Sequence, residues 1–301
     1  MKLPRHERYD LSIIDERPHY DWPDGKRLAF YVGTNIEYFA FAAGVGSDIA
    51  FKEFGATQTQ RNYSWRDYGV RAGVWRMLDL LEEFSLPGAH NCSSVMYETC
   101  PQIMARIRTR GDEVIGHGRT QSERHSGMWE DDEARIIRDI TDVITAHDGV
   151  RPTGWMGAGL TRTRQTIDLL KEAGYLYVMD WCCDDQPFWM KTRSGPILAL
   201  PYSMEVNDGI AIMSRQQSAQ DFADVIVDQF EEMIKQCERQ PLVFTHAIHA
   251  HIMGQPFRLR VLREAYRHIV NHPRRDLVWF AHPRDIARHV MGLPHGIVPG
   301  I

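Results

Sequence analysis

Short apolar runs rich in β-branched and aromatic residues alternate along this chain with longer segments whose apolar residues recur at helical spacing. Parallel strands joined by crossover helices produce this alternation. It predicts strands at residues 28–33, 88–92, 113–117, 152–156, 175–181, 197–202, 241–246 and 276–281. Strands that are apolar on both faces need cover on both sides, which a closed or nearly closed barrel supplies. The sequence therefore predicts an α/β protein built as a barrel of β/α units.

The apolar stripes between these runs predict a helix from about Val70 and two later helices, whose stripes run from Ile136 to Ile144 and from Phe222 to Cys237, each helix burying one face. The 301 residues are 43% apolar and carry no long biased tract, so we expect one domain over residues 1–301. Residues 39–65 interrupt the alternation. Loops of this length inside a compact domain are usually functional, and we expect a lid or an oligomer contact there.

Charge and cysteine usage exclude several classes of protein. The net charge of -5 is spread along the chain without a basic stripe, so we expect no nucleic-acid partner. The N-terminus "MKLPRHERYD" has no apolar core of a signal peptide and no apolar run is long enough to span a bilayer, which favours a soluble cytoplasmic protein without a membrane partner. Five scattered cysteines without CxxC spacing indicate neither a disulfide framework nor a thiolate zinc site.

Polar residues gather where the predicted strands end, which is where β/α barrels place their chemistry. The candidates, in chain order, are Asn35, Glu37, His117, Trp155, Asp184, Asp185, Glu205, Asp208, His246, His249, His251 and Gln255. Carboxylates and imidazoles within hydrogen-bond reach of one another suit acid/base catalysis. After the histidines, Gly254 predicts an unusual backbone angle and Pro256 the first turn of a helix.

Six segments, taken in order, resemble the polysaccharide deacetylase (NodB-homology) superfamily: "TNIE", "GDEVIGHG", "RPTGW", "DDQPFW", "LPYSMEVND" and "IHAHIMGQPFR". Within it they are most similar to the branch of cofactor-independent allantoinases and related cyclic-amide hydrolases. The resemblance runs from about residue 20 to 290. It implies a distorted seven-stranded (β/α) barrel, hydrolysis of a C–N bond in a small-molecule substrate, and assembly as a homodimer or homotetramer.

The resemblance also implies which residues to compare with metal-dependent members, where one acid and a His-x-x-x-His pair hold the ion. Here His117 is followed four residues later by Gln121. A neutral amide oxygen is a poor replacement for imidazole at zinc. We therefore expect no cofactor and no catalytic metal. If a divalent metal such as zinc were bound, Glu37, His117 and His125 would be its ligands.

The mechanism that follows uses Glu37 with His117 to activate and orient water, and His249 to protonate the leaving nitrogen or polarise the carbonyl. Asp184 or Asp185 is expected to set the tautomer of His249. Trp155 is expected to form an apolar wall. Asn35, Glu205, Asp208 and Gln255 are expected to contact substrate, although Asp208 equally suits a loop cap. Two alternatives stay open: a metal-dependent deacetylase of N-acetylated sugars, and a non-catalytic protein that binds a small ligand on the same barrel.

Overall fold

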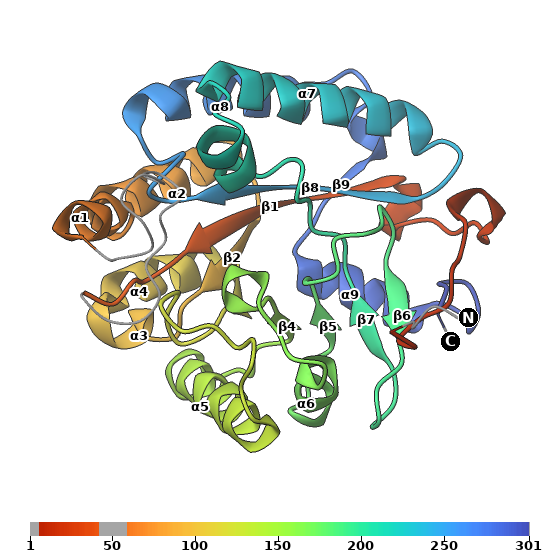
Figure 1. Ribbon diagram of the computed structural model, residues 1–301. Helices are drawn as coiled ribbons and strands as arrows, with labels where there is room; N and C mark the ends of the chain where they lie inside the picture. The colour runs from red at the N-terminus through yellow and green to blue at the C-terminus, as the bar shows by residue number, and fades with distance from the viewer. Residues whose placement is uncertain (1–5, 42–58, 301) are drawn as a thin grey trace.

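The computed structural model describes residues 6–41 and 59–300 and places one curled sheet at its centre, with helices packed around it (Figure 1). The strands are β1 Leu28–Ile36, β2 Gly88–Cys92, β3 Glu113–Gly116, β4 Gly154–Trp155, β5 Tyr177–Val178, β6 Phe188–Met190, β7 Ile197–Ala199, β8 Leu242–His249 and β9 Val278–Phe280. The helices are α1 Gln60–Tyr68, α2 Val74–Glu83, α3 Met96–Thr99, α4 Pro101–Arg110, α5 Glu130–Asp148, α6 Thr166–Glu172, α7 Ala219–Gln236, α8 Pro256–Val270 and α9 Pro283–Gly292. Every predicted strand is present, and β6 is an additional one.

Parallel strands form the body of the sheet in the order β7-β5-β4-β3-β2-β1-β8. Strand β6 runs antiparallel to β7 at one edge, and β9 pairs with β1 at Leu28–Phe30. The seam between β7 and β8 is bridged by the chain that follows β7, where Ala247 N donates to Val206 O over 2.8 Å. This arrangement is the distorted seven-stranded (β/α) barrel that the sequence predicts.

Side chains along each strand alternate between the inside and the outside of the barrel. In β1, Tyr31 belongs to the inner apolar cluster, whereas Phe30 packs in the outer layer beneath the helices. Glu37, just past the end of β1, is an even number of residues from Tyr31 and therefore faces the same, inner side. In β8 the same alternation points the His249 side chain to the inside of the barrel and the His246 side chain to the outer face. Two histidines three residues apart therefore lie on opposite sides of the sheet.

Two glycines hold the loop after β8 against the start of α2. A Cβ on Gly254 would lie 2.4 Å from Gly73 Cα, and a Cβ on Gly73 would lie 2.0 Å from Ala250 O. Gly254 does not have a positive φ, so the unusual backbone angle predicted for it is wrong. The residue is glycine because two backbones touch there. Pro256 begins α8 at its first turn, as predicted.

Three further expectations concern the chain as a whole. The cysteines are free thiols, as their spacing predicts. Within residues 6–41 and 59–300, no helix is both long enough and apolar enough to cross a bilayer. Most of the loop predicted as a lid or oligomer contact, residues 42–58, lies outside the described residues.

Candidate active site

Two imidazoles approach one carboxylate oxygen of Glu37, and the three side chains come from the ends of different strands. Glu37 follows β1, His117 follows β3 and His249 ends β8. Glu37 Oε1 lies 3.4 Å from His117 Nε2 and 3.8 Å from His249 Nε2. The Glu37 side chain is 10% exposed, so the cluster is shielded from solvent but not sealed. The carboxyl ends of β1, β3 and β8 thus bring together the three residues on which the predicted chemistry rests.

The tautomer of His117 is fixed by a backbone carbonyl. His117 Nδ1 lies 2.7 Å from Met156 O, and because a carbonyl only accepts, Nδ1 is the donor. Met156 is itself held to the neighbouring strand, since its N–H donates to Gly116 O. When the ring is neutral, Nε2 presents a lone pair to Glu37. Two acceptors then face each other across 3.4 Å, an arrangement that a bridging proton donor would stabilise.

His249 is held by a single buried carboxylate, Asp208. Asp208 Oδ1 accepts from His249 Nδ1 at 2.5 Å, and Asp208 Oδ2 accepts from the backbone N–H of the same residue at 2.7 Å. Burial alone would lower the pKa of His249, but the carboxylates of Asp208 and Glu37 raise it to about 9. The imidazole is therefore protonated at neutral pH, with Nε2–H on the side of Glu37.

The charge of Glu37 complements that of His249. Burial alone would raise the pKa of Glu37, but His249 and His117 lower it to about 2. Glu37 is consequently ionised throughout the physiological range. A buried carboxylate with a pKa this low is a weak proton acceptor and a strong hydrogen-bond acceptor.

The expectation that Asp184 or Asp185 sets the tautomer of His249 is wrong. Both oxygens of Asp184 pair with the guanidinium of Arg17, each at 2.7 Å. Asp185 is exposed, and its backbone carbonyl accepts from Val243 N. Asp208, expected to contact substrate or to cap a loop, instead performs the orienting role. It reaches His249 because the chain after β7 bridges the barrel seam directly before it.

Of the other candidate substrate contacts, Asn35 and Trp155 lie where they cannot serve as predicted, whereas contact of Glu205 with substrate stays a prediction. Asn35 is buried and has its side chain engaged by Tyr202, Asn91 and Ile248 O. Trp155 is fully buried in the outer layer, edge-on to Tyr175, so it forms no wall of an open pocket. The Glu205 side chain is 73% exposed and pairs with Arg215. Gln255 is half-buried at the start of α8, and its contact with substrate stays a prediction.

The other two histidines of β8 and its loop have different surroundings. His246 packs between Phe244 and Phe30 on the outer face, its Nε2 2.8 Å from Tyr266 OH, and burial lowers its pKa to about 3. His251 lies edge-on to Trp65, and burial together with the charge of His249 lowers its pKa to about 3. Both are neutral rings, and His251 is the one that borders the cluster, with 5.8 Å between its ring centroid and that of His249.

Asp180 is named by its position at the end of the fifth predicted strand, together with Asp184 and Asp185, but the sequence interpretation gives it no role. It follows β5, is 7% exposed, and its Oδ1 accepts from Gly157 N at 2.7 Å. Its Oδ2 has no hydrogen-bond partner among the described residues. Burial raises the pKa of Asp180 to about 6, against the opposing charge of Arg162 and His117. Its position at a strand end was the available signal, but the neighbouring pair Asp184 and Asp185 was the more conspicuous.

The residues present do not fit a catalytic metal. Gln121 occupies the position of the second histidine of the metal-binding pattern, and its amide nitrogen donates to His117 O. His125 is turned toward α5, with Nδ1 3.7 Å from Glu133 Oε1. The proposed ligand set of Glu37, His117 and His125 is therefore not assembled.

Among the described ranges, the one converging group of three ligand-type residues lies on the outer helices: Glu231, His268 and His272. His272 Nδ1 accepts from Arg274 N, so its Nε2 carries the hydrogen and is unavailable to a metal in that tautomer.

Comparisons with known proteins agree with this geometry. The sequence profile of the family described as polysaccharide deacetylase matches residues 57–178. A protein of Schizosaccharomyces pombe whose name assigns it to the polysaccharide deacetylases is 23% identical, covering 91% of this chain and 92% of its own. A Pseudomonas aeruginosa PAO1 crystal structure named as a polysaccharide deacetylase superposes with a TM-score of 0.79 at 27% identity, covering 90% of this chain and 93% of its own.

The family profile, the curated relative and this solved structure all show that the chain is similar to the polysaccharide deacetylases. The crystal structure of PuuE allantoinase is similar as well, with a TM-score of 0.80 and 26% identity over 93% of this chain and 97% of that one. The family recognised from the sequence is confirmed, and an allantoinase stands among its structural neighbours.

Proposed function

We propose that this protein hydrolyses a carbon–nitrogen bond in a small cyclic amide, imide or ureide by acid/base catalysis alone. The observation that carries the proposal is the Asp208–His249–Glu37 array, in which a charged imidazole and a charged carboxylate face each other in a shielded site. The likeness to PuuE allantoinase supports a ring amide as the substrate.

In the proposed reaction, water lies between His117 Nε2 and Glu37 Oε1, donating one hydrogen bond to each. Its oxygen attacks the carbonyl carbon as its proton passes to His117 Nε2, while the ionised Glu37 holds the water in line. His249 Nε2–H then donates its proton to the departing nitrogen as the C–N bond breaks. The products are a carboxylic acid and the freed nitrogen group, and proton exchange with solvent restores His117 and His249.

The pKa of His249 suits the role of general acid. A general acid is most effective when its pKa lies near or slightly above the working pH, because it is then both protonated and able to give up the proton. Asp208 and Glu37 together place the pKa of His249 at about 9. Both carboxylates also stabilise the imidazolium before the reaction begins.

The first alternative, a metal-dependent deacetylase of N-acetylated sugars, is supported by the names of the family and of two relatives. Gln121 and the orientation of His125 weigh against it. The second alternative, a binding protein without turnover, does not explain why His249 is held protonated beside Glu37.

A hydrolysis screen separates these functions. The purified chain is incubated with allantoin, hydantoin, dihydrouracil, succinimide and N-acetylglucosamine oligomers, with and without a strong chelator. We expect ring opening of one of the cyclic compounds, unchanged by chelator. Deacetylation that chelator abolishes would establish the first alternative instead.

Two variants test the binding-protein alternative. Glu37→Gln removes the carboxylate that orients the water for proton transfer to His117, and His249→Ala removes the general acid, so each should reduce turnover by roughly 10²–10⁴-fold, the range for impaired acid/base catalysis. Ligand binding measured by calorimetry without any turnover in the wild type would contradict the proposal.

A further inference from the structure

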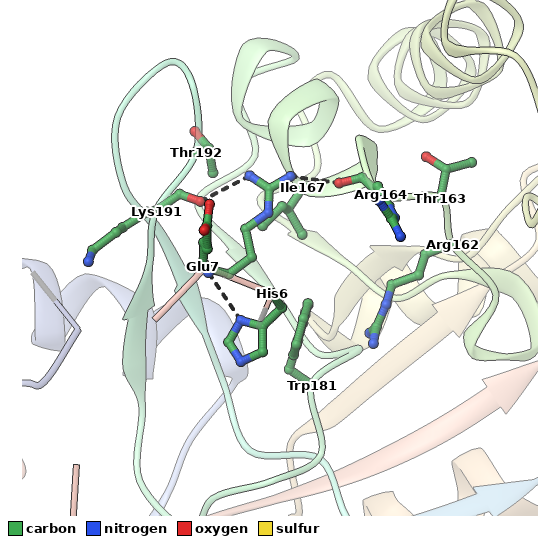
Figure 2. A pocket seen from close by; sticks show the side chains of 10 residues that line it. His6, Glu7, Arg162, Thr163, Arg164, Ile167, Trp181, Lys191 and Thr192 are labelled. Carbon is green, nitrogen blue, oxygen red and sulfur yellow. Dashed lines mark hydrogen bonds between the residues drawn. The ribbon is translucent and has the colours of Figure 1, made fainter. Parts of the chain in front are cut away.

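A pocket of about 860 Å³ lies between the N-terminal arm, the loop after β4 and the turn that joins β6 to β7 (Figure 2). Glu37, His117 and His249 do not line it. Its volume is in the range of small-molecule sites. This space is therefore distinct from the catalytic cluster, and its occupant is a separate question.

The charge of this pocket is opposite to that of the chain. Four of its lining side chains are cations, namely Arg8, Arg162, Arg164 and Lys191, and the lining carboxylate is Glu7. The chain as a whole has a net charge of -5. A concave surface that reverses the overall sign concentrates anions locally.

Two of these cations are already neutralised. Arg8 pairs with both oxygens of Asp168, at 2.8 and 2.7 Å, and Lys191 lies 3.1 Å from Asp10. Arg162 and Arg164, in contrast, form no ion pair with any carboxylate in residues 6–41 and 59–300. These two guanidinium groups are the lining cations that no carboxylate of the described residues approaches within ion-pair distance.

The pocket is also built from fixed parts. The Arg8 guanidinium donates to the backbone carbonyls of Arg164, at 2.6 Å, and Lys191, at 3.2 Å, which ties these two segments of the lining together. Arg162 lies over the Trp181 ring, with Cζ 4.1 Å from the centroid, and Nη1 donates to Asp180 O at 2.9 Å. A guanidinium held by one edge and one face keeps its other N–H donors available without further loss of side-chain entropy.

We propose that this pocket binds a small molecule bearing a carboxylate or phosphate group, with Arg162 and Arg164 contacting the anion and the Trp181 ring packing against its apolar part. Planar guanidinium groups pair with both kinds of oxyanion through two parallel hydrogen bonds. The pocket is separate from the Glu37, His117 and His249 cluster, because none of these three residues lines it.

The test is calorimetric titration of the full chain at low ionic strength with inorganic phosphate, with succinate, and with succinamide as the uncharged match of succinate. We expect saturable binding of at least one anion and none of succinamide. Tighter phosphate binding would identify phosphate esters as the natural class, and tighter succinate binding would identify carboxylates. If neither anion bound more tightly than succinamide, the proposal would be overturned.

Variants locate the binding. Arg162→Gln and Arg164→Gln should each weaken anion binding at least tenfold. Arg138→Gln, an exposed arginine on α5 outside the pocket, is the matched control and should leave it unchanged. The Arg164 side chain is exposed and makes no described hydrogen bond, so Arg164→Gln decides the question even if Arg162→Gln does not fold. Wild-type affinity in Arg164→Gln, or equal loss in Arg138→Gln, would refute the assignment.

Discussion

Asp208 binds His249 twice, accepting one hydrogen bond from the imidazole Nδ1 and a second from the backbone N–H of the same residue. The two contacts fix the position and the tautomer of the ring together, because one carboxylate satisfies both donors. The ring cannot rotate about its side-chain bonds without losing the first contact, while the second holds the backbone.

Replacing Asp208 by Asn tests this arrangement. The amide retains the shape but loses the charge that raises the pKa of His249, and its NH₂ group can favour the wrong tautomer. We expect kcat to fall by roughly 10²–10⁴-fold while the fold is retained. Steady-state kinetics and circular dichroism measure both. Asp228→Asn, on the exposed face of α7, is the control and should match the wild type within about twofold.

The pH dependence of kcat/KM reports the same proton. His249 has a pKa of about 9 and acts as the acid, so activity should fall as the pH rises through about 9. Glu37, with a pKa of about 2, contributes no acidic limb between pH 4 and 9. In Asp208→Asn the basic limb should move to lower pH. An activity that increases through pH 9 would show that His249 acts as a base instead.

The stability of the fold should follow His249 in the same direction. Its pKa is about 9 in the folded chain and near 6.5 when unfolded, so the folded state binds the proton more tightly. This contribution is complete below about pH 6.5 and is lost as the pH rises through about 9. Urea unfolding at pH 6.5 and 9.5 should show a smaller pH-dependent loss in His249→Ala than in the wild type.

His246 and His249 should separate stability from catalysis. His246→Phe removes the partner of Tyr266 OH on the outer face and leaves that hydroxyl buried without a hydrogen bond, at a cost of about 1–3 kcal/mol. We expect kcat to stay within about twofold of the wild type, measured beside urea unfolding curves. A loss of kcat comparable to that in His249→Ala would place His246 in the catalytic cluster after all.

Gly254 should tolerate no side chain. A Cβ there would lie 2.4 Å from Gly73 Cα, so Gly254→Ala must push α2 away from the loop that follows His249, at a cost of about 1–3 kcal/mol or more. We expect lower thermal stability together with a reduced kcat. Gly292→Ala, at the end of α9, meets nothing within 4 Å and should be neutral or slightly stabilising.

Strand positions and the meeting of Glu37, His117 and His249 were predictable because both follow from simple periodicity. Apolar runs locate the strands, and polar residues directly after them lie at one end of a parallel barrel. Glu37, His117 and His249 were found in this way. The same parity separates His246 from His249, since residues three apart in a strand face opposite sides.

Partner assignments were not predictable in the same way. Asp184 and Asp208 both follow strands, and only the path of the chain decides which of them reaches His249. Strand β6 was missed because three residues between "DDQP" and "KTRSG" give too short a pattern. Trp155 was misplaced because a residue inside a two-residue strand offers no alternation from which to assign a face. The single-domain organisation and the homo-oligomeric state stay predictions.

The bridge between Val206 and Ala247 closes the seam of the barrel, and Asp208 stands two residues beyond it on the same stretch of chain. The same stretch of chain therefore closes the barrel seam and places Asp208 against His249, where it keeps the imidazole protonated. A molecule that opened along this seam would lose its turnover while nearly all of its helices were still folded. Loss of turnover should therefore be the earliest sign of unfolding.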